Sequence, residues 1–152
     1  MHGMFNQTNA FNQDITGWDV SSVTNMVGMF NEANAFNQDL SNWDFSSVTT
    51  MERMFQSAAI FNQDISSWDV SSVENMTNMF RSTSGFNNGG VTLNWNDKTS
   101  NVTTMQTMFY QASGFNQDIS NWNVSSVTSC DLFSQYSGLD NAYIPTFTNC
   151  SP

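Results

Sequence analysis

Aspartate is the residue type that recurs in this chain at a spacing suited to chemistry. Two series of carboxylates repeat with a period of about 25 residues: Asp14, Asp39 and Asp64, and then Asp19, Asp44 and Asp69. Such residues can hold calcium between neighbouring carboxylates, act as the acid and base of a glycosidase, or accept backbone N–H groups in turns. We expect the turn role for both series, with calcium bound by these same six residues as the alternative.

Catalysis is not expected from these residues. The only histidine, His2, stands at the start of the chain, and no Ser, His and Asp set is present that could activate a nucleophile. A carboxylate pair that recurs in every unit has no unique cleft in which its two pKa values could be driven apart. We therefore predict a protein that is not an enzyme and has no cofactor beyond the calcium considered above.

The charge balance limits the class of partner. The chain has 13 acidic residues against Arg53, Arg81 and Lys98, for a formal net charge of -10. A phosphate backbone would be repelled, so nucleic acid is not an expected partner. No run approaches the roughly 18 apolar residues of a membrane span, and no signal peptide is visible. A protein or another cell-surface component is the expected partner.

The carboxylates belong to a repeat that covers most of the chain. A Met-Phe pair opens each copy, Phe-Asn follows, and Trp stands near the end. The pairs are Met4-Phe5, Met29-Phe30, Met54-Phe55, Met79-Phe80 and Met108-Phe109, and Leu132-Phe133 continues the series. One unit of this length cannot bury its own apolar side chains, whereas stacked units can, so the sequence predicts a solenoid.

Each unit combines two hydrophobic periods. Val23, Met26, Met29, Phe30 and Ala33 recur at three- and four-residue steps, which is typical of one helix face. The Trp-Asp-Val triplet alternates as a short strand does. We therefore predict an α/β repeat solenoid, in which each coil adds one short strand to a parallel sheet and one short helix. A bare β-helix without helices is the alternative, and the three- and four-residue spacing argues against it.

Serine is placed where the predicted helices would begin. Ser71 with Glu74 has the spacing of a capping box. The same position recurs along the chain, and we expect these serines to be helix N-caps: Ser21, Ser46, Ser71, Ser100 and Ser125.

The repeat defines the expected organisation of the chain. We predict a solenoid of five to six coils over residues 1–135 and a C-terminal cap over 136–152. The first unit begins inside a predicted helix, so its apolar face is expected to be covered by a preceding stretch of chain or by a partner, self-association included.

The segment 87–100 contains an insertion of four residues and is the unique element of the repeat. Insertions in solenoids map to loops on one face, which is often the binding face. We take Asn88, Trp95, Asp97 and Lys98 as a contact loop, with a neutral surface loop as the alternative. Elsewhere, the Asn of each Phe-Asn pair is expected to form a side-chain ladder, and the Trp series is expected to be core.

Two cysteines lie near the C-terminus. Cys130 stands where other units have Met, and Cys150 lies in the tail. We predict a Cys130–Cys150 disulfide, which places the protein in an oxidising compartment. Two buried thiols, or a metal pair, are the alternatives.

The stretches 36–44 (FNQDLSNWD) and 68–76 (WDVSSVENM) resemble the short-period BspA-like surface repeats. The resemblance extends over about residues 1–135 and departs from the family pattern over 87–100. It implies a fold like that of leucine-rich repeats, a cell-surface location, and a role in adhesion or protein interaction, without catalytic residues.

We therefore expect an extracellular surface-repeat domain that acts as an interaction or adhesion scaffold. The alternative is a structural subunit of a surface layer, sheath or filament that assembles end to end.

Overall fold

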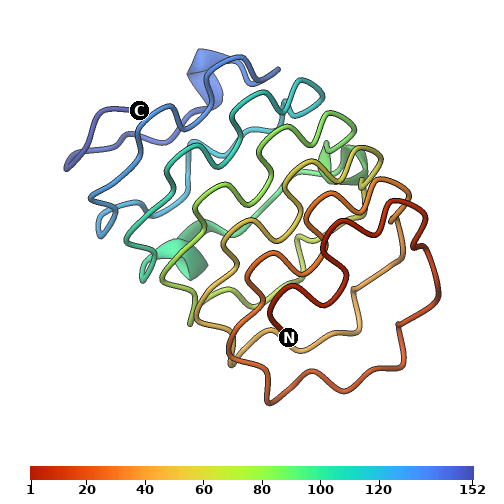
Figure 1. Ribbon diagram of the computed structural model, residues 1–152. Coiled ribbons are helices and arrows are strands. Elements are labelled where there is room, and N and C mark those ends of the chain that lie inside the picture. The colour runs from red at the N-terminus through yellow and green to blue at the C-terminus, as the bar shows by residue number, and fades with distance from the viewer.

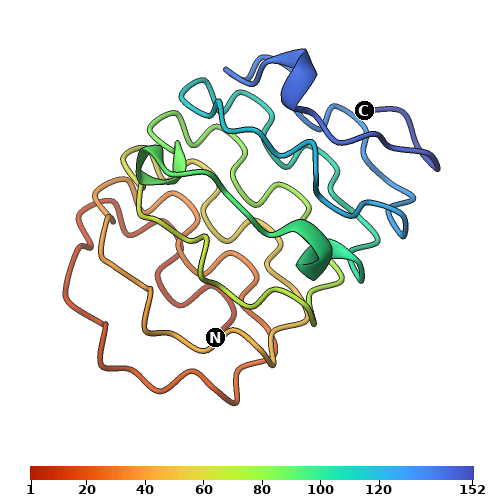
Figure 2. The same cartoon turned by 180° about the vertical axis from the view of Figure 1, so that it is seen from behind.

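The chain winds into successive coils that stack along one axis, and the computed structural model describes all residues, 1–152 (Figure 1). The view from behind shows the same order, with the first coil at one end of the stack and the last coil at the other (Figure 2). Regular elements are few and short: the 3-10 helices η1 (Asn88–Gly90), η2 (Asn96–Thr99) and η3 (Asn141–Tyr143). We call this arrangement the coil stack.

The predicted α/β solenoid of the leucine-rich-repeat type is wrong. The structure contains no α-helix, and its strand content is limited to isolated parallel bridges between neighbouring coils. These bridges form a single row: Asn25 with Thr50, Thr50 with Asn75, Asn75 with Thr104, and Thr104 with Ser129. One short helix and one strand per coil are therefore absent, and so is the parallel sheet. The row of bridges is also too sparse for the bare β-helix that was the alternative.

Left-handed residues explain why the predicted helices do not form. Within each segment that was expected to be helical, two positions have φ near +60°, such as Gly28 and Glu32. A residue in this region ends a right-handed helix. The first position holds Gly3, Gly28, Arg53, Asn78, Thr107 and Leu132, and the second holds Gln7, Glu32, Ser57, Ser82, Gln111 and Tyr136.

Tight turns replace the helix and reproduce its hydrophobic spacing. The N–H of Met29 donates to the carbonyl of Met26 at 3.2 Å, and the N–H of Ala33 donates to that of Phe30 at 3.1 Å. These bonds span three residues, where an α-helix spans four. A succession of such turns places apolar side chains inward at three- and four-residue steps, which is the pattern that suggested a helix.

Between the residues whose N–H groups bond within a turn lie residues whose N–H groups donate to a neighbouring coil. Gly28 donates to the carbonyl of Glu52 at 2.8 Å, and Phe30 donates to that of Met54 at 2.9 Å. The same register recurs in this segment from the first coil to the last, and here each coil donates to the coil that follows it in the chain. Elsewhere in the coil the bonds run the other way, as from the N–H of Thr49 to the carbonyl of Thr24 at 2.9 Å. A single coil would leave these groups unpaired, and stacking is therefore required for the backbone as well as for the core.

Aromatic side chains fill the interior in two columns. Phe30 stacks on Phe55 in the next coil at a centroid distance of 5.4 Å, and on Phe36 in its own coil at 3.9 Å. Phe30, Phe36 and Phe55 are fully buried. The first column is Phe5, Phe30, Phe55, Phe80 and Phe109, and the second is Phe11, Phe36, Phe61, Phe86 and Phe115.

The last coil keeps the 25-residue step, which corrects the sequence alignment by one residue. Thr107 donates to the carbonyl of Asp131 as Asn78 donates to Gln106 in the coil before. Phe133 therefore takes the place of Met108, and Ser134 takes the place of the aromatic Phe109. The sequence pattern had placed the Leu132-Phe133 pair at the Met-Phe position.

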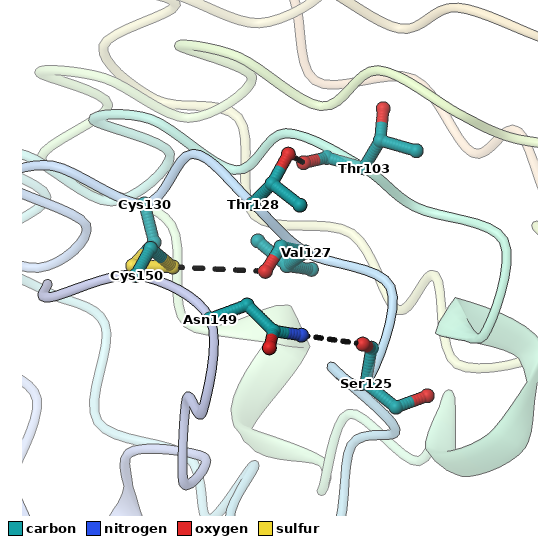
Figure 3. Close-up of a disulfide and its surroundings, with 7 residues drawn as sticks. All are labelled: Thr103, Ser125, Val127, Thr128, Cys130, Asn149 and Cys150. Atoms are coloured by element: carbon teal, nitrogen blue, oxygen red, sulfur yellow. Dashed lines mark hydrogen bonds between the residues drawn. A yellow bond between two sulfur atoms is a disulfide. The ribbon is translucent and has the colours of Figure 1, made fainter.

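The tail, which was predicted to be a cap, runs alongside the preceding coil. Gly138 donates to the carbonyl of Ala112 at 3.2 Å, and the side chain of Asn149 donates to the carbonyl of Ser125 at 2.8 Å (Figure 3). Cys150 forms a disulfide with Cys130, with an S–S distance of 2.06 Å, so the predicted pairing is confirmed. No helix in the structure combines the length and apolar character that crossing a bilayer would require.

Candidate functional site

Exposed carboxylates form two columns along one side of the coils. The first carboxylate column is Asp14, Asp39, Asp64 and Asp118, and the second is Asp19, Asp44 and Asp69. All seven are exposed. Neighbouring members belong to neighbouring coils, apart from the gap that the insertion leaves before Asp118. The stack therefore presents a regular array of negative charge.

Each carboxylate holds a turn through one oxygen. Asp14 Oδ1 accepts the N–H of Thr16 at 2.9 Å and its hydroxyl at 2.7 Å. Asp19 Oδ1 accepts the N–H of Ser21 at 3.0 Å and its hydroxyl at 2.7 Å. The expectation that these residues accept N–H groups in turns is therefore confirmed.

The serines that were predicted to be helix N-caps have a different role. Ser21 donates to Asp19, Ser46 to Asp44, and Ser71 to Asp69, each from its backbone N–H. Ser125 donates in the same way to Asn123 Oδ1. Ser100 follows η2 and does not precede a helix. The N-cap prediction and the Ser71–Glu74 capping box are wrong because no α-helix starts at these positions.

Hydrogen bonding to the ionised form lowers the pKa of several of these groups. The N–H and hydroxyl of Thr16 lower the pKa of Asp14. The hydroxyl and N–H of the serine two residues later lower the pKa of Asp19, Asp44, Asp69 and Asp118. Repulsion between neighbours opposes this in part, because Asp19 raises the pKa of Asp44 and Asp44 raises that of Asp69. The hydrogen bonds within the turns therefore favour the charged form of these five carboxylates.

The carboxylate arrangement does not support the calcium hypothesis. No group of three or more His, Cys, Asp or Glu residues lies close enough together to hold a metal ion. The six residues considered for calcium, Asp14, Asp39, Asp64, Asp19, Asp44 and Asp69, are spread along the two columns.

The insertion at 87–100 brings only part of the predicted contact loop to the surface. Asn88 and Trp95 are fully buried: Asn88 Oδ1 accepts the N–H of Ile65 at 2.8 Å, and Trp95 Nε1 donates to the carbonyl of the same residue at 3.1 Å. Asp97 is exposed. Lys98 Nζ donates to the carbonyl of Trp68 at 2.9 Å, and its charge lowers the pKa of Asp69. The insertion therefore places the charge of Lys98 near Asp69, which is the last member of the second carboxylate column.

The predicted asparagine ladder is confirmed. Asn37 Oδ1 accepts the N–H of Asn62 and the side-chain amide of Gln63, both at 2.9 Å. Asn12 pairs with Asn37 and Gln38 in the same way one coil earlier. The sequence pattern missed the glutamine after each of these asparagines, which binds the neighbouring coil and strengthens the ladder.

Four of the five tryptophans are buried, as predicted for a core column, and Trp18 in the first coil is 39% exposed. Trp43 Nε1 donates to the carbonyl of Ile15 at 3.1 Å, and Trp122 Nε1 donates to that of Leu93 at 3.0 Å. Trp68 is the exception: its Nε1 has no partner. The ring of Trp68 stacks on that of Phe45 at a centroid distance of 3.9 Å. Phe45 stands at the position where neighbouring units have Val.

A shallow polar depression, which sequence reasoning missed, crosses the middle coils. Its lining contains no hydrophobic residue and consists of Thr49, Ser72, Glu74, Asn101, Thr103 and Ser126. The signal in the sequence was Glu74, which interrupts a series of threonines. Thr49 and Thr103 use their hydroxyls to bind the carbonyls of Thr24 and Glu74, so this face is also held by contacts between coils.

Stacked coils that are joined by backbone bonds and side-chain ladders define a repeat protein. The chain belongs to the family described as "Mycoplasma protein of unknown function, DUF285", whose family model matches residues 1–95 and 88–144. No curated protein matches the chain. No solved structure matches it either.

Proposed function

We propose that the chain is a BspA-like surface-repeat domain that acts outside the cell as a scaffold for adhesion or protein interaction. The observation that carries the proposal is the pair of carboxylate columns. Their members are exposed, and each is fixed by a turn to a backbone that is itself bonded to the neighbouring coils. Fixed charges at a regular spacing suit recognition of a basic, extended protein surface at low cost in side-chain ordering.

Two further features support this role. The Cys130–Cys150 disulfide suits an oxidising, extracellular setting. The net charge of -10 favours steering of a basic partner and disfavours nucleic acid. The sequence resemblance to BspA-like repeats points to the same location and role.

Binding can be tested with fluorescently labelled, oxidised chain on intact animal cells, measured by flow cytometry. The matched variant replaces the second carboxylate column with asparagines (D19N, D44N and D69N). The turns should survive, because Asn123 already accepts both the N–H and the hydroxyl of Ser125 in the equivalent turn. We expect saturable binding that weakens with salt and falls at least several-fold in the variant.

A second triple variant, D14N, D39N and D64N, shows whether one column or both contact the partner. Absence of saturable binding would contradict the proposal, as would unchanged binding by both triple variants. For location, an antibody to the chain should label intact cells of the source organism without permeabilisation. Labelling that requires permeabilisation would contradict an extracellular role.

A further inference from the structure

The polar depression of the middle coils has one charged side chain, Glu74, and its carboxylate has no partner in the molecule. The residue is fixed through its backbone: its N–H donates to the carbonyl of Thr49, and its carbonyl accepts the N–H of Thr103, both at 2.9 Å. No hydrogen bond or ion pair engages the carboxylate, and the residue is exposed. The backbone under this negative charge is therefore fixed, while the charge itself is open to a ligand.

The oxygens around Glu74 are arranged to accept hydrogen bonds. The hydroxyls of Thr49 and Thr103 each donate to a carbonyl of the preceding coil, at 3.2 and 3.1 Å. Because a hydroxyl has a single proton, both oxygens can then only accept. The side-chain amide of Asn101 donates to the carbonyl of Ser71 at 2.7 Å, which leaves its Oδ1 open. The depression therefore offers acceptors from three coils around one negative charge.

The three cations of the chain are engaged elsewhere. Arg53 Nε lies 3.4 Å from a carboxylate oxygen of Glu52. The guanidinium of Arg81 lies over an aromatic ring, 5.1 Å from its centroid. Lys98 Nζ donates to a backbone carbonyl at 2.9 Å. A cation that pairs with Glu74 must therefore come from another molecule.

The lining of the depression favours a cationic group with several N–H donors. The depression has a volume of about 530 Å³ and no hydrophobic residue in its lining, so it offers no surface to an apolar group. Thr49, Glu74 and Thr103 follow one another across coils that are spaced like hydrogen-bonded strands, about 4.8 Å apart. A guanidinium has five N–H donors in a planar fork and no acceptor, so it can bond several of these oxygens at once.

We propose that the polar depression binds the guanidinium group of an arginine side chain that a protein partner contributes. Its N–H groups donate to the carboxylate of Glu74 and to the hydroxyl oxygens of Thr49 and Thr103. The inference rests on the interaction role proposed above, and it adds a point of contact outside the two carboxylate columns.

The test is a titration of the oxidised, ¹⁵N-labelled full chain with the blocked tripeptide acetyl-Gly-Arg-Gly-amide, followed by amide chemical shifts at constant ionic strength. We expect saturable shifts that are largest at Thr49, Glu74 and Thr103. The same peptide with citrulline, a neutral analogue of arginine, should bind at least several-fold more weakly. A lysine peptide should also bind more weakly, because an ammonium is a point charge and not a planar fork.

Two substitutions of Glu74 test the site itself. Glu74→Gln removes the charge at constant size. Glu74→Thr installs the residue of the other coils, such as Thr49, and should therefore fold. Glu32→Gln is the matched control: Glu32 does not line the depression, and Gln7 stands at its position in the first coil. We expect both Glu74 variants to bind the arginine peptide at least several-fold more weakly, and E32Q to bind it as wild type does.

The proposal would be overturned by wild-type affinity in both Glu74 variants, by shifts centred on the carboxylate columns, or by the absence of saturable shifts. Equal affinity for the lysine or citrulline peptide would overturn the assignment to a guanidinium. The cell-binding assay is read separately. Saturable cell binding without peptide binding at the depression would overturn this inference and support the proposed function. Peptide binding at the depression without cell binding would do the reverse.

Discussion

At the scale of single residues, side-chain oxygens complete the hydrogen bonding that the coil backbone leaves open. Asn37 Oδ1 serves two donors of the next coil, and Asp19 Oδ1 serves two donors of its own turn. The bonds of Asn37 are partly buried and those of Asp19 are exposed, and a typical hydrogen bond contributes about 0.5–1.5 kcal/mol. Such side chains therefore explain how a chain with few regular elements forms a defined structure.

Trp68 and Trp95 should respond differently to the same substitution. Trp95 Nε1 donates to the carbonyl of Ile65, whereas Trp68 Nε1 is buried without a partner. Trp95→Phe loses a hydrogen bond, and Trp68→Phe removes an unsatisfied donor. We expect Trp95→Phe to lower the free energy of unfolding by about 1–2 kcal/mol more than Trp68→Phe does, measured by urea denaturation. Equal losses would show that Trp68 has a partner after all.

Stability should depend on acid in a defined direction. The pKa values of Asp14, Asp19, Asp44, Asp69 and Asp118 are lowered in the folded state. A depressed folded pKa adds stability above the unfolded value, which is about 4 for aspartate, and this is lost as pH falls through the folded pKa. The free energy of unfolding should therefore be highest above about pH 4 and decline below it.

The D19N, D44N and D69N variant provides the control for this pH dependence. Its asparagines keep the turn acceptor but do not titrate, so the decline in acid should be shallower than in wild type. A decline as steep as that of wild type would assign the acid sensitivity to other groups.

At the scale of elements, the left-handed positions determine that each coil is a series of turns. Gly28 lies at φ +60° and Gly17 does not lie in the left-handed region. A Cβ has room at both sites, so the two glycines differ mainly in backbone conformation.

Gly28→Ala should therefore destabilise and Gly17→Ala should not. A non-glycine residue in the left-handed region costs about 1–2 kcal/mol, and we expect Gly28→Ala to lower the free energy of unfolding by about that amount in urea. Gly17→Ala should be neutral or slightly stabilising, because alanine restricts the unfolded chain. If Gly28→Ala were stabilising, φ at that position would have to be negative.

At the scale of the whole molecule, the repeat period was the part of the fold that the sequence could predict. It located the coils, the Asn37 ladder and the tryptophan core, and the cysteine pattern predicted the disulfide. The conformation within each coil was mispredicted, because turns with bonds to the third residue bury side chains at nearly the spacing of a helix. Gly3 and Gly28, in the middle of the expected helices, were the available signal.

The candidate site was also predictable only where its residues repeat from unit to unit. The carboxylate columns were visible because they repeat, and their role in turns follows from the serine or threonine two residues later. The burial of Trp95 agrees with the tryptophan series, and not with its place in the contact loop. The burial of Asn88 could not be predicted, because the inserted residues lack a second copy against which to compare them.

The central claim is that neighbouring coils, and not helical turns, pair the backbone. The most direct measurement is a set of nuclear Overhauser contacts on isotope-labelled chain. The account predicts contacts between the amide proton of Phe30 and the protons of Met54 and Phe55, since the N–H of Phe30 lies 2.9 Å from the carbonyl oxygen of Met54. The equivalent contacts should recur in every coil. The account would be contradicted by a different pattern over residues 23–33. In that pattern each residue would contact the residue four positions later, as in an α-helix, and contacts between coils would be missing.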